Sequence, residues 1–465
     1  CVSLETVVPG VTVWMVPPLD PHKMAEALRE ALTHPEEACR RGARGKEWVS
    51  ERFTARTMCE KTVQLYRSAY NERLAARNRT TLTVMQLLPE LNSGGVERGT
   101  LEMGRYLVGN GHRSIVVSGG GRLVAQLEKE GSRHYQKDIG SKSPLALFNI
   151  WPLRQLIRKE EVSVLHLRSR MPAWVGYFAW KSLPPKHRPL LVTTFHGFYS
   201  VNSYSAIMTK GEGVIAVSES IREHIDTNYQ RRDKVRLIFR GVDAESFDPD
   251  RVAPERVAAL AEAWQIDRSK PVLMLPGRLT RLKGQELFLK SLLLVKEKNY
   301  QAVLVGDPAE NPGYSREIID FIEQYDLSDR ARCVGYCADM PAAFLVADLV
   351  LSTSSLEPEA FGRTTVEAMA MGRPVIATAH GGSLETVIPG ENGWLVKPSD
   401  PASLAAAIDE ALALEPTRLQ HFGENGRQRV LKNFTAKAMC EQTLAFYNCL
   451  IAAKKPDLPE ATPPG

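Results

Sequence analysis

Short aliphatic and β-branched runs alternate with amphipathic helical stretches over most of this 465-residue chain, from about residue 81 to residue 450. That alternation is typical of βαβ units, in which helices join parallel strands. The first six runs are 82–88, 114–118, 162–167, 190–195, 213–218 and 234–239. Six more follow at 271–276, 301–306, 331–335, 348–352, 374–378 and 393–396. The pattern predicts an α/β protein with two Rossmann-like, doubly wound domains.

A polar, proline-containing stretch at 242–256 separates the two series and is the expected interdomain linker. A chain of this length also exceeds what one hydrophobic core usually organises. Ligands of such sheets bind beyond the carboxyl ends of the strands, so we expect a substrate in a cleft between the two domains. The expected divisions are 1–78, 79–245 for the first domain, 246–433 for the second, 434–453 for a closing helix that packs back on the first domain, and 454–465 for a flexible tail.

Residues 1–78 break this pattern, because one short strand candidate at 13–17 is followed only by helical periodicity. An internal repeat explains the difference. The repeat pairs 3–21, SLETVVPGVTVWMVPPLDP, with 383–401, SLETVIPGENGWLVKPSDP, and after a one-residue slip pairs 42–66 with 423–447. We therefore expect a mainly helical appendage, a truncated duplicate of the chain's own C-terminal tail.

Charge and composition exclude several classes of protein. The net charge of +5 is spread without a block of like charges, so a nucleic-acid partner is not expected. No apolar run is long enough to span a bilayer, and the N-terminal residues lack the pattern of a signal peptide. We expect a cytoplasmic protein. Its seven cysteines include no CxxC pair, which favours reduced thiols.

Two glutamates stand out in SSLEPEAFGRTTVEAMAMGRPVIAT, residues 354–378. Glu359 precedes a predicted helix and Glu367 lies on it, so one carboxylate can lie deeper in a cleft than the other. This arrangement suits a ligand with hydroxyls at both ends, such as a sugar nucleotide. Phe361 and Gly362 open the helix, where free backbone N–H groups favour an anion. A bare pair of glutamates is more often a solvated helix face.

Two cations follow the first strand of the second domain, in PGRLTRLKGQ at 276–285. Arg278 and Lys283 stand five residues apart where the strand ends, and Gly277 and Gly284 allow a close turn. Fixed cations in such a place can bind a diphosphate, although exposed surface charge is the alternative.

A glycine pair follows the first strand of the first domain, in LNSGGVERG at 91–99. Gly94 and Gly95 would let a phosphate or sugar approach the backbone, although a simple turn is the alternative. The segment is not GxGxxG, so the nicotinamide-binding fingerprint is absent. His196 ends another strand, where a single histidine is more often structural.

The segment at 354–378 resembles the signature of family-four, GT-B-fold retaining glycosyltransferases, in which two glutamates are separated by seven residues. The likeness extends from about residue 81 to residue 450. It implies that Glu359 contacts the donor sugar and Glu367 the ribose of the nucleotide. The amides that would meet the sugar belong to Ala360, Phe361 and Gly362.

The other motifs also have counterparts in that family. PGRLTRLKGQ resembles its diphosphate motif, which assigns that role to Gly277, Arg278 and Lys283. The resemblance also implies donor contacts for Gly94, Gly95, His196, Gly381, Gly382 and Glu385, with His196 as a polar contact rather than a general base. Arg240 replaces an asparagine common in the family, so the contacts of that asparagine are not carried over.

The resemblance implies transfer of a sugar from a nucleotide-sugar donor, a UDP-sugar in our expectation, to a hydroxyl of a glycan or glycolipid. It implies retention of configuration and no metal or other cofactor, with Glu359, Arg278, Lys283 and His196 as the catalytic set. Bacterial relatives with this layout often build lipopolysaccharide or other envelope glycans. Residues 1–78 would then be the tail of a preceding glycosyltransferase module.

Three alternatives concern the function and location of the chain. A nucleotide-sugar epimerase would need an acid and a base beside the sugar, and the glutamate signature argues against it. A non-catalytic scaffold would be expected to lack one of the four charged residues at 278, 283, 359 and 367, and all four are present. The stretch 151–162, with Arg168 and Arg170, could meet anionic lipid at the inner membrane, or it could be a solvated helix face.

Overall fold

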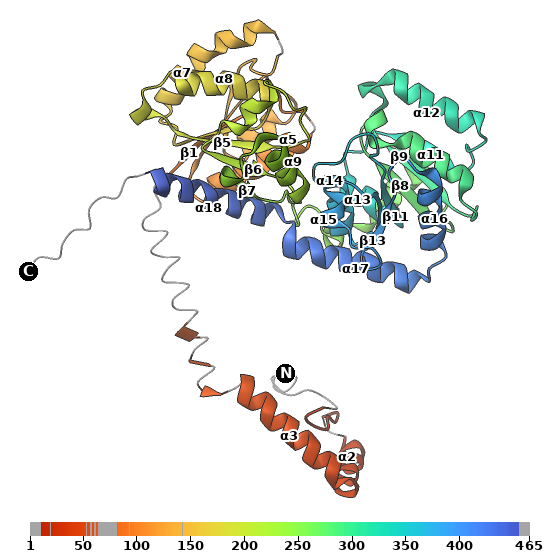
Figure 1. Cartoon of the computed structure of the whole chain (residues 1–465). Helices are drawn as coiled ribbons and strands as arrows, with labels where there is room; N and C mark the ends of the chain where they lie inside the picture. Colours follow the sequence, from red (N-terminus) through yellow and green to blue (C-terminus); the bar gives the residue numbers. More distant parts are fainter. Residues whose placement is uncertain are drawn as a thin grey trace, which may run out of the picture. The chain divides into compact units, whose positions relative to one another are not determined.

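The computed structural model describes residues 11–18, 20–52, 54–55, 58–59, 62–63, 81–92, 94–141 and 143–454. The chain divides into two compact units, Cys1–Thr80 and Thr81–Gly465. Figure 1 shows the helices and strands of each unit.

The first domain of the larger unit is built on a parallel seven-stranded sheet with the order β3-β2-β1-β4-β5-β6-β7. Its strands are β1 (Thr83–Leu87), β2 (Arg113–Ser118), β3 (Arg133–Gln136), β4 (Val164–Leu167), β5 (Leu190–Phe195), β6 (Gly213–Ala216) and β7 (Val235–Leu237). The connecting helices include α5 (Gly95–Gly109), α6 (Val124–Lys129), α7 (Ile150–Lys159), α8 (Arg170–Lys181) and α9 (Glu219–Tyr229). Strands such as β1 are buried along their whole length, as expected when helices cover both faces of a parallel sheet.

The second domain has a parallel six-stranded sheet with the order β10-β9-β8-β11-β12-β13. Its strands are β8 (Val272–Pro276), β9 (Gln301–Val305), β10 (Ala331–Gly335), β11 (Leu349–Ser352), β12 (Val375–Thr378) and β13 (Gly393–Val396). Its helices are α10 (Pro254–Ala263), α11 (Gln285–Leu294), α12 (Pro312–Gln324), α13 (Met340–Val346), α14 (Arg363–Ala370), α15 (Ser383–Thr386), α16 (Pro401–Leu412) and α17 (Pro416–Asn433).

The predicted α/β class with two Rossmann-like domains is confirmed, and each strand predicted beyond residue 81 is present. The prediction missed β3. This short edge strand reads RHYQ, and its residues are exposed or half-buried, so it lacks the apolar pattern that marks a buried strand.

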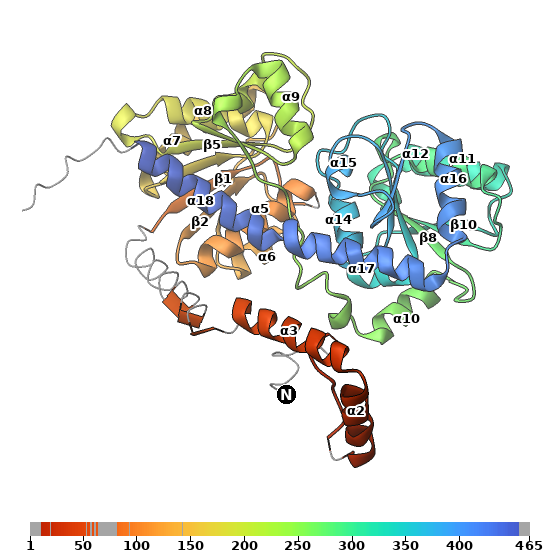
Figure 2. The same ribbon diagram turned by 60° about the horizontal axis from the view of Figure 1, so that its bottom comes forward.

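The chain passes between the two domains twice, near Val242 and near Phe434, and the two crossing segments are hydrogen-bonded to each other. Val242 donates its backbone N–H to the Phe434 carbonyl at 2.9 Å, and Ala436 donates to the Val242 carbonyl at 2.7 Å. Beyond this crossing, α18 (Ala436–Lys454) packs on the first domain, whereas α17 lies along the second (Figure 2). The α18 side chains that join the core of the first domain are Met439, Cys440, Leu444 and Tyr447.

The smaller unit contains α2 (Pro21–Thr33) and α3 (Pro35–Arg52), which agrees with the expected helical N-terminal region. The predicted strand at 13–17 is wrong, because only Val13 forms a bridge and 14–17 lie in no strand. The matching segment of the repeat, β13, pairs in parallel with β12, and no described strand in the smaller unit could pair with 13–17 in that way.

The two matching segments of the sequence have helices at corresponding positions. Pro21 and Pro401 each open a helix after a capping aspartate, Asp20 or Asp400, and the next helix of each copy has 18 residues. In the larger unit Trp394 stacks on Phe422, with ring centroids 4.7 Å apart. The equivalent positions in the smaller unit hold Trp14 and Arg41, and the guanidinium carbon lies 4.1 Å from the indole centroid.

Candidate active site

A cleft of about 920 Å³ lies between the two sheets and is lined by residues of both domains of the larger unit. Its position, where the strands end, is that expected for ligand binding in doubly wound folds. Seven of the predicted site residues line this cleft: Gly94, Gly95, Gly277, Arg278, Lys283, Glu359 and Glu367.

Local backbone geometry explains how two of these motifs reach the cleft. The turn after β8 ends at Gly284, which has φ +72° and precedes α11, and a Cβ there would overlap the Thr353 carbonyl. Gly362 precedes α14 with φ +80°. Only glycine adopts such positive φ angles at little cost, so both motifs need a glycine where the chain turns into the helix.

Lys283 and Glu359 form an ion pair inside the cleft. The two side chains are 27% and 21% exposed, and Ser354 Oγ also donates to Glu359 at 2.6 Å. Burial raises the pKa of Glu359, but the charge and hydrogen bond of Lys283, together with Ser354, outweigh that effect and hold the pKa below its usual value. The carboxylate is therefore ionised and oriented before any ligand binds.

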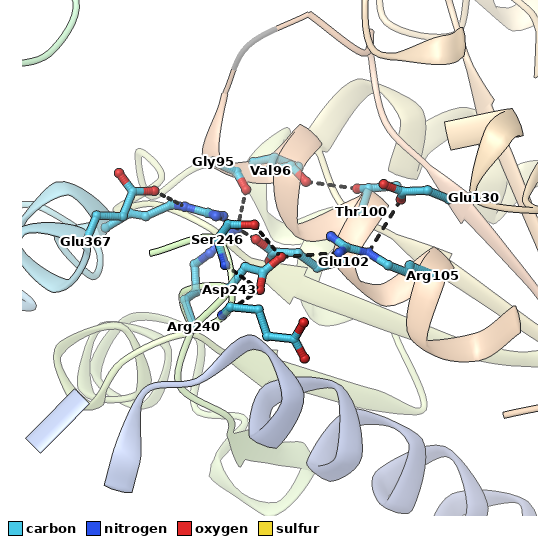
Figure 3. A network of polar contacts seen from close by, with 12 residues as sticks. Gly95, Val96, Thr100, Glu102, Arg105, Glu130, Arg240, Asp243, Ser246 and Glu367 are labelled. Carbon is cyan, nitrogen blue, oxygen red and sulfur yellow. Dashed lines mark hydrogen bonds and ion pairs between the residues drawn. The ribbon is translucent and has the colours of Figure 1, made fainter. Parts of the chain in front are cut away.

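Arg363 joins Glu367 to the first domain. Its Nε donates to Glu367 at 2.8 Å within α14, and its Nη2 donates to Glu102 of α5 at 2.5 Å. Figure 3 shows the two carboxylates approaching from opposite domains. The side chains of Arg363, Glu102 and Glu367 are 15%, 6% and 10% exposed. Burial lowers the pKa of Arg363, but the two carboxylates reverse that effect and raise it above its usual value.

Arg240 links two of the predicted motifs within the first domain. Its guanidinium donates to the Gly95 carbonyl in the glycine loop (Figure 3) and, at 3.0 Å, to Nδ1 of His196. His196 does not line the cleft but a second, smaller cavity. Burial lowers the pKa of His196 well below its usual value, and the charges of Arg240 and Arg168 add to that effect.

The remaining predicted residues do not line the cleft, and their donor contacts stay predictions. The Gly382 N–H donates to the Glu359 carbonyl at 2.8 Å, so the loop containing Gly381 and Gly382 positions the backbone of Glu359. The predicted residues that do not line the cleft are Ala360, Phe361, Gly362, Gly381, Gly382, Glu385 and His196.

Phe361 and Glu385 have structural partners. Phe361 is 3% exposed and packs against the aromatic rings of Phe239 and Phe434 near the domain crossing. The Glu385 carboxylate accepts hydrogen bonds from the backbone N–H of Glu219 at 2.7 Å and of Ser220 at 3.0 Å. It therefore caps the N-terminus of α9, which belongs to the first domain.

Sequence reasoning did not assign a role to Arg363, Glu102 or Arg240. Arg363 stands within the glutamate signature, four residues before Glu367, and that spacing was an available signal for an ion pair on one helix face. Glu102 gave no signal, because its contact with Arg363 joins residues 261 positions apart.

The described residues show neither a metal-binding cluster nor a membrane-spanning helix. Within them, no group of three or more His, Cys, Asp or Glu side chains is arranged to hold a metal ion. In the same part of the chain, no helix has both the length and the hydropathy needed to cross a membrane.

The fold and its cleft define a two-domain glycosyltransferase architecture, and comparison with known families identifies the family. Residues 93–246 match the model for Glycosyltransferase Family 4, and 258–429 match that for Glycosyl transferases group 1. A glycosyltransferase from Rickettsia africae ESF-5, known from its crystal structure, is 34% identical with a TM-score of 0.73, covering 80% of this chain and 99% of that chain. The chain therefore belongs to the glycosyltransferases described by these two models, family 4 and group 1, and is a transferase enzyme.

Two other relatives are more distant. The lipopolysaccharide core biosynthesis mannosyltransferase LpsB of Rhizobium meliloti (strain 1021) is 29% identical over 253 residues, which cover 53% of this chain and 68% of LpsB. Anabaena Alr3699/HepE, solved in complex with UDP-glucose, is 22% identical with a TM-score of 0.70, covering 79% of this chain and all of that chain. The second likeness shows the shared fold alone.

Proposed function

We propose that this glycosyltransferase moves a hexose from a nucleotide-sugar donor, a UDP-sugar, to a hydroxyl of a glycan or glycolipid, in lipopolysaccharide or other cell-envelope synthesis. One observation carries the proposal: Arg278, Lys283, Glu359 and Glu367 line one cleft, opposite the glycine loop at 94–95. The cleft volume of about 920 Å³ suits a ligand of nucleotide-sugar size.

Each charged group has a distinct role in the proposed reaction. Arg278 and Lys283 stabilise the diphosphate as negative charge develops on it, while Glu359 holds the sugar and Glu367 the ribose. These cations replace a metal ion in that role. The acceptor hydroxyl attacks the anomeric carbon on the face the diphosphate leaves, which retains the configuration, and a phosphate oxygen takes the hydroxyl proton.

Donor turnover tests this proposal. The purified chain is incubated with UDP-, GDP- and ADP-sugars and varied glycan acceptors, and the released nucleotide is measured. We expect release with a UDP-sugar, its loss in Glu359→Ala, and a raised donor KM in Glu367→Ala. Glu357→Ala is the matched control, because Glu357 is an exposed loop residue that does not line the cleft. Wild-type turnover in both signature variants, or no donor binding by the wild type, would refute the proposal.

A glycolipid acceptor implies contact with the cytoplasmic face of the inner membrane, and we propose that the α7 region makes it. Phe148 and Trp151 are 77% and 60% exposed, and Arg154 stacks over the Trp151 ring at 4.8 Å. Aromatic and cationic side chains of this kind bind lipid headgroup regions. Arg168 is not part of this surface, because its side chain is buried. Arg170 instead stacks on Tyr199, with its guanidinium carbon 4.8 Å from the ring centroid.

Vesicle sedimentation tests the membrane contact. We expect the wild type to sediment with vesicles of anionic lipid more than with vesicles of neutral lipid, and Phe148→Ser/Trp151→Ser to remain in the supernatant. Tyr325→Ser is the control, since Tyr325 is an exposed aromatic residue of the second domain. Equal sedimentation of all three proteins would refute the assignment.

We also propose that residues 1–78 are the tail of a second glycosyltransferase copy. The corresponding helix starts and the contacts of Trp14 and Trp394 at equivalent positions support a common origin. The smaller unit contains no counterpart of the four charged cleft residues, so we expect deletion of 1–78 to preserve donor turnover. Loss of turnover together with a lower Tm would show that the complete copy depends on this segment.

A further inference from the structure

The first domain contains a second cavity, separate from the cleft. It has a volume of about 20 Å³ and lies where β4 and β5 end, with α18 forming part of its wall. The two cavities share no lining residue. A space of this size holds one water molecule or one ion of similar size.

Three N–H groups of side chains that line this cavity have no acceptor among the described residues: Arg168 Nε, Arg240 Nε and His196 Nε2. The arginine nitrogens are obligatory donors. His196 Nδ1 lies 3.0 Å from Arg240 Nη1 and must accept that hydrogen bond, so the proton of the neutral ring lies on Nε2. All three groups are therefore donors that need an acceptor.

The charge around the cavity is also unbalanced. Arg168 and Arg240 are 5% and 6% exposed, and their guanidinium groups converge, because a Cβ on Gly99 would lie 2.5 Å from Arg240 Nη2 and 3.3 Å from Arg168 Nη2. Within the described part of the chain both arginines donate only to neutral acceptors: the Gln86 side-chain oxygen, His196 Nδ1 and the Gly95 carbonyl.

The nearby carboxylates do not remove this imbalance. Glu102 and Glu97 raise the pKa of both arginines, but neither carboxylate accepts a hydrogen bond from them among the described residues, and Glu102 Oε1 accepts from Arg363 at 2.5 Å. Burial, with further contributions from Arg363 and Arg168, lowers the pKa of Arg240 to about 9. Burying a charge without a counter-charge is costly, so an anion in the cavity would stabilise both guanidinium groups.

We propose that this cavity is a binding site for a single-atom anion, chloride or another halide, held by Arg168 Nε, Arg240 Nε and His196 Nε2. A water molecule fits the donors less well, because its own two hydrogens would need acceptors and it carries no charge. The bound anion keeps Arg240 in place, and Arg240 in turn holds the carbonyl of Gly95 at the edge of the cleft.

Bromide substitution tests the site directly. Crystals of the full chain are grown with bromide as the sole halide and without donor, and anomalous diffraction is measured at the bromine edge. We expect one peak in the cavity, within hydrogen-bond distance of the three N–H groups. An ordered cavity that contains only water, or that gives no anomalous peak, would overturn the proposal.

Thermal denaturation of the wild type and of an Arg240 variant provides a second test. Tm is measured while chloride replaces gluconate at constant ionic strength. Chloride at ten times its Kd should raise the folded-to-unfolded ratio about 11-fold and thereby increase Tm. Arg240→Asn, which installs the residue common in similar enzymes, should lose this increase. Arg222→Asn, at an arginine more than a third exposed, should keep it. A wild-type Tm independent of chloride would count against the site. Both measurements omit the donor, so their outcome is independent of the transferase proposal.

Discussion

Replacing Arg363 with methionine tests the ion-pair triad that joins the two domains. The change leaves Glu102 and Glu367 without their shared cation, although both residues are more than nine-tenths buried. Removing one partner of a buried ion pair typically costs about 3–5 kcal/mol. The two lost charge-assisted hydrogen bonds, at about 1.5–3 kcal/mol each, give a similar sum. We therefore expect the free energy of unfolding to fall by about 3–5 kcal/mol.

Urea titration followed by tryptophan fluorescence measures this loss. Arg222→Met is the matched control, since Arg222 pairs with Glu219 through side chains that are 36% and 35% exposed and such pairs contribute at most about 1 kcal/mol. A double-mutant cycle with Glu102→Gln isolates the contact between the domains, and we expect a coupling energy above about 1 kcal/mol. A cost for Arg363→Met no larger than that for Arg222→Met would refute the assignment of a stabilising triad.

Three further substitutions test other parts of the site. Lys283→Met leaves burial as the main influence on the Glu359 pKa, which should change from lowered to raised. The wild type should therefore have a higher Tm than the variant above the unfolded pKa of about 4.5. This difference in Tm should shrink as the pH falls through the lowered pKa of the wild-type Glu359. Gly284→Ala places a Cβ against the Thr353 carbonyl at φ +72° and should lower the unfolding free energy by at least about 1–2 kcal/mol, whereas Gly313→Ala, where a Cβ meets no atom within 4 Å, should not destabilise the protein. Glu385→Ala removes the acceptor of the first two N–H groups of α9 but leaves the N-cap Ser218 in place, and should cost about 0.5–2 kcal/mol in urea titration, with Glu391→Ala as an exposed control.

The sequence predicted most of the fold because buried parallel strands carry a strong local signal. β1 and β8 are short, mostly apolar and followed by glycine-containing turns, so their positions could be inferred without tertiary information. The strand predicted at 13–17 has the same local pattern but is not a strand, since strand formation also requires a pairing partner. β3 is the opposite case, a polar segment that is a strand because β2 offers it an edge.

The site was predictable where a motif is contiguous and unpredictable where the contact is between distant segments. The positions of Lys283 and Glu359 follow from two turns that end neighbouring strands, β8 and β11. The contact between Arg240 and Gly95 joins positions 145 residues apart, and no local pattern indicates it. Arg240 was recognised only as a departure from the related enzymes, and the structure shows that this departure adds a buried charge to the first domain.

The ligand-free cleft pairs several of its own charges, which affects how a donor would bind under the proposed function. A diphosphate approaching Lys283 must compete with Glu359, and a ribose approaching Glu367 must share it with Arg363. When a diphosphate binds Lys283, Glu359 loses its partner, and a sugar hydroxyl can take that place. The complete donor therefore offers a new partner to both Lys283 and Glu359, whereas the nucleotide alone offers one only to Lys283. The pairing thus favours the intact donor over the released nucleotide, because only the donor leaves neither charge unpaired.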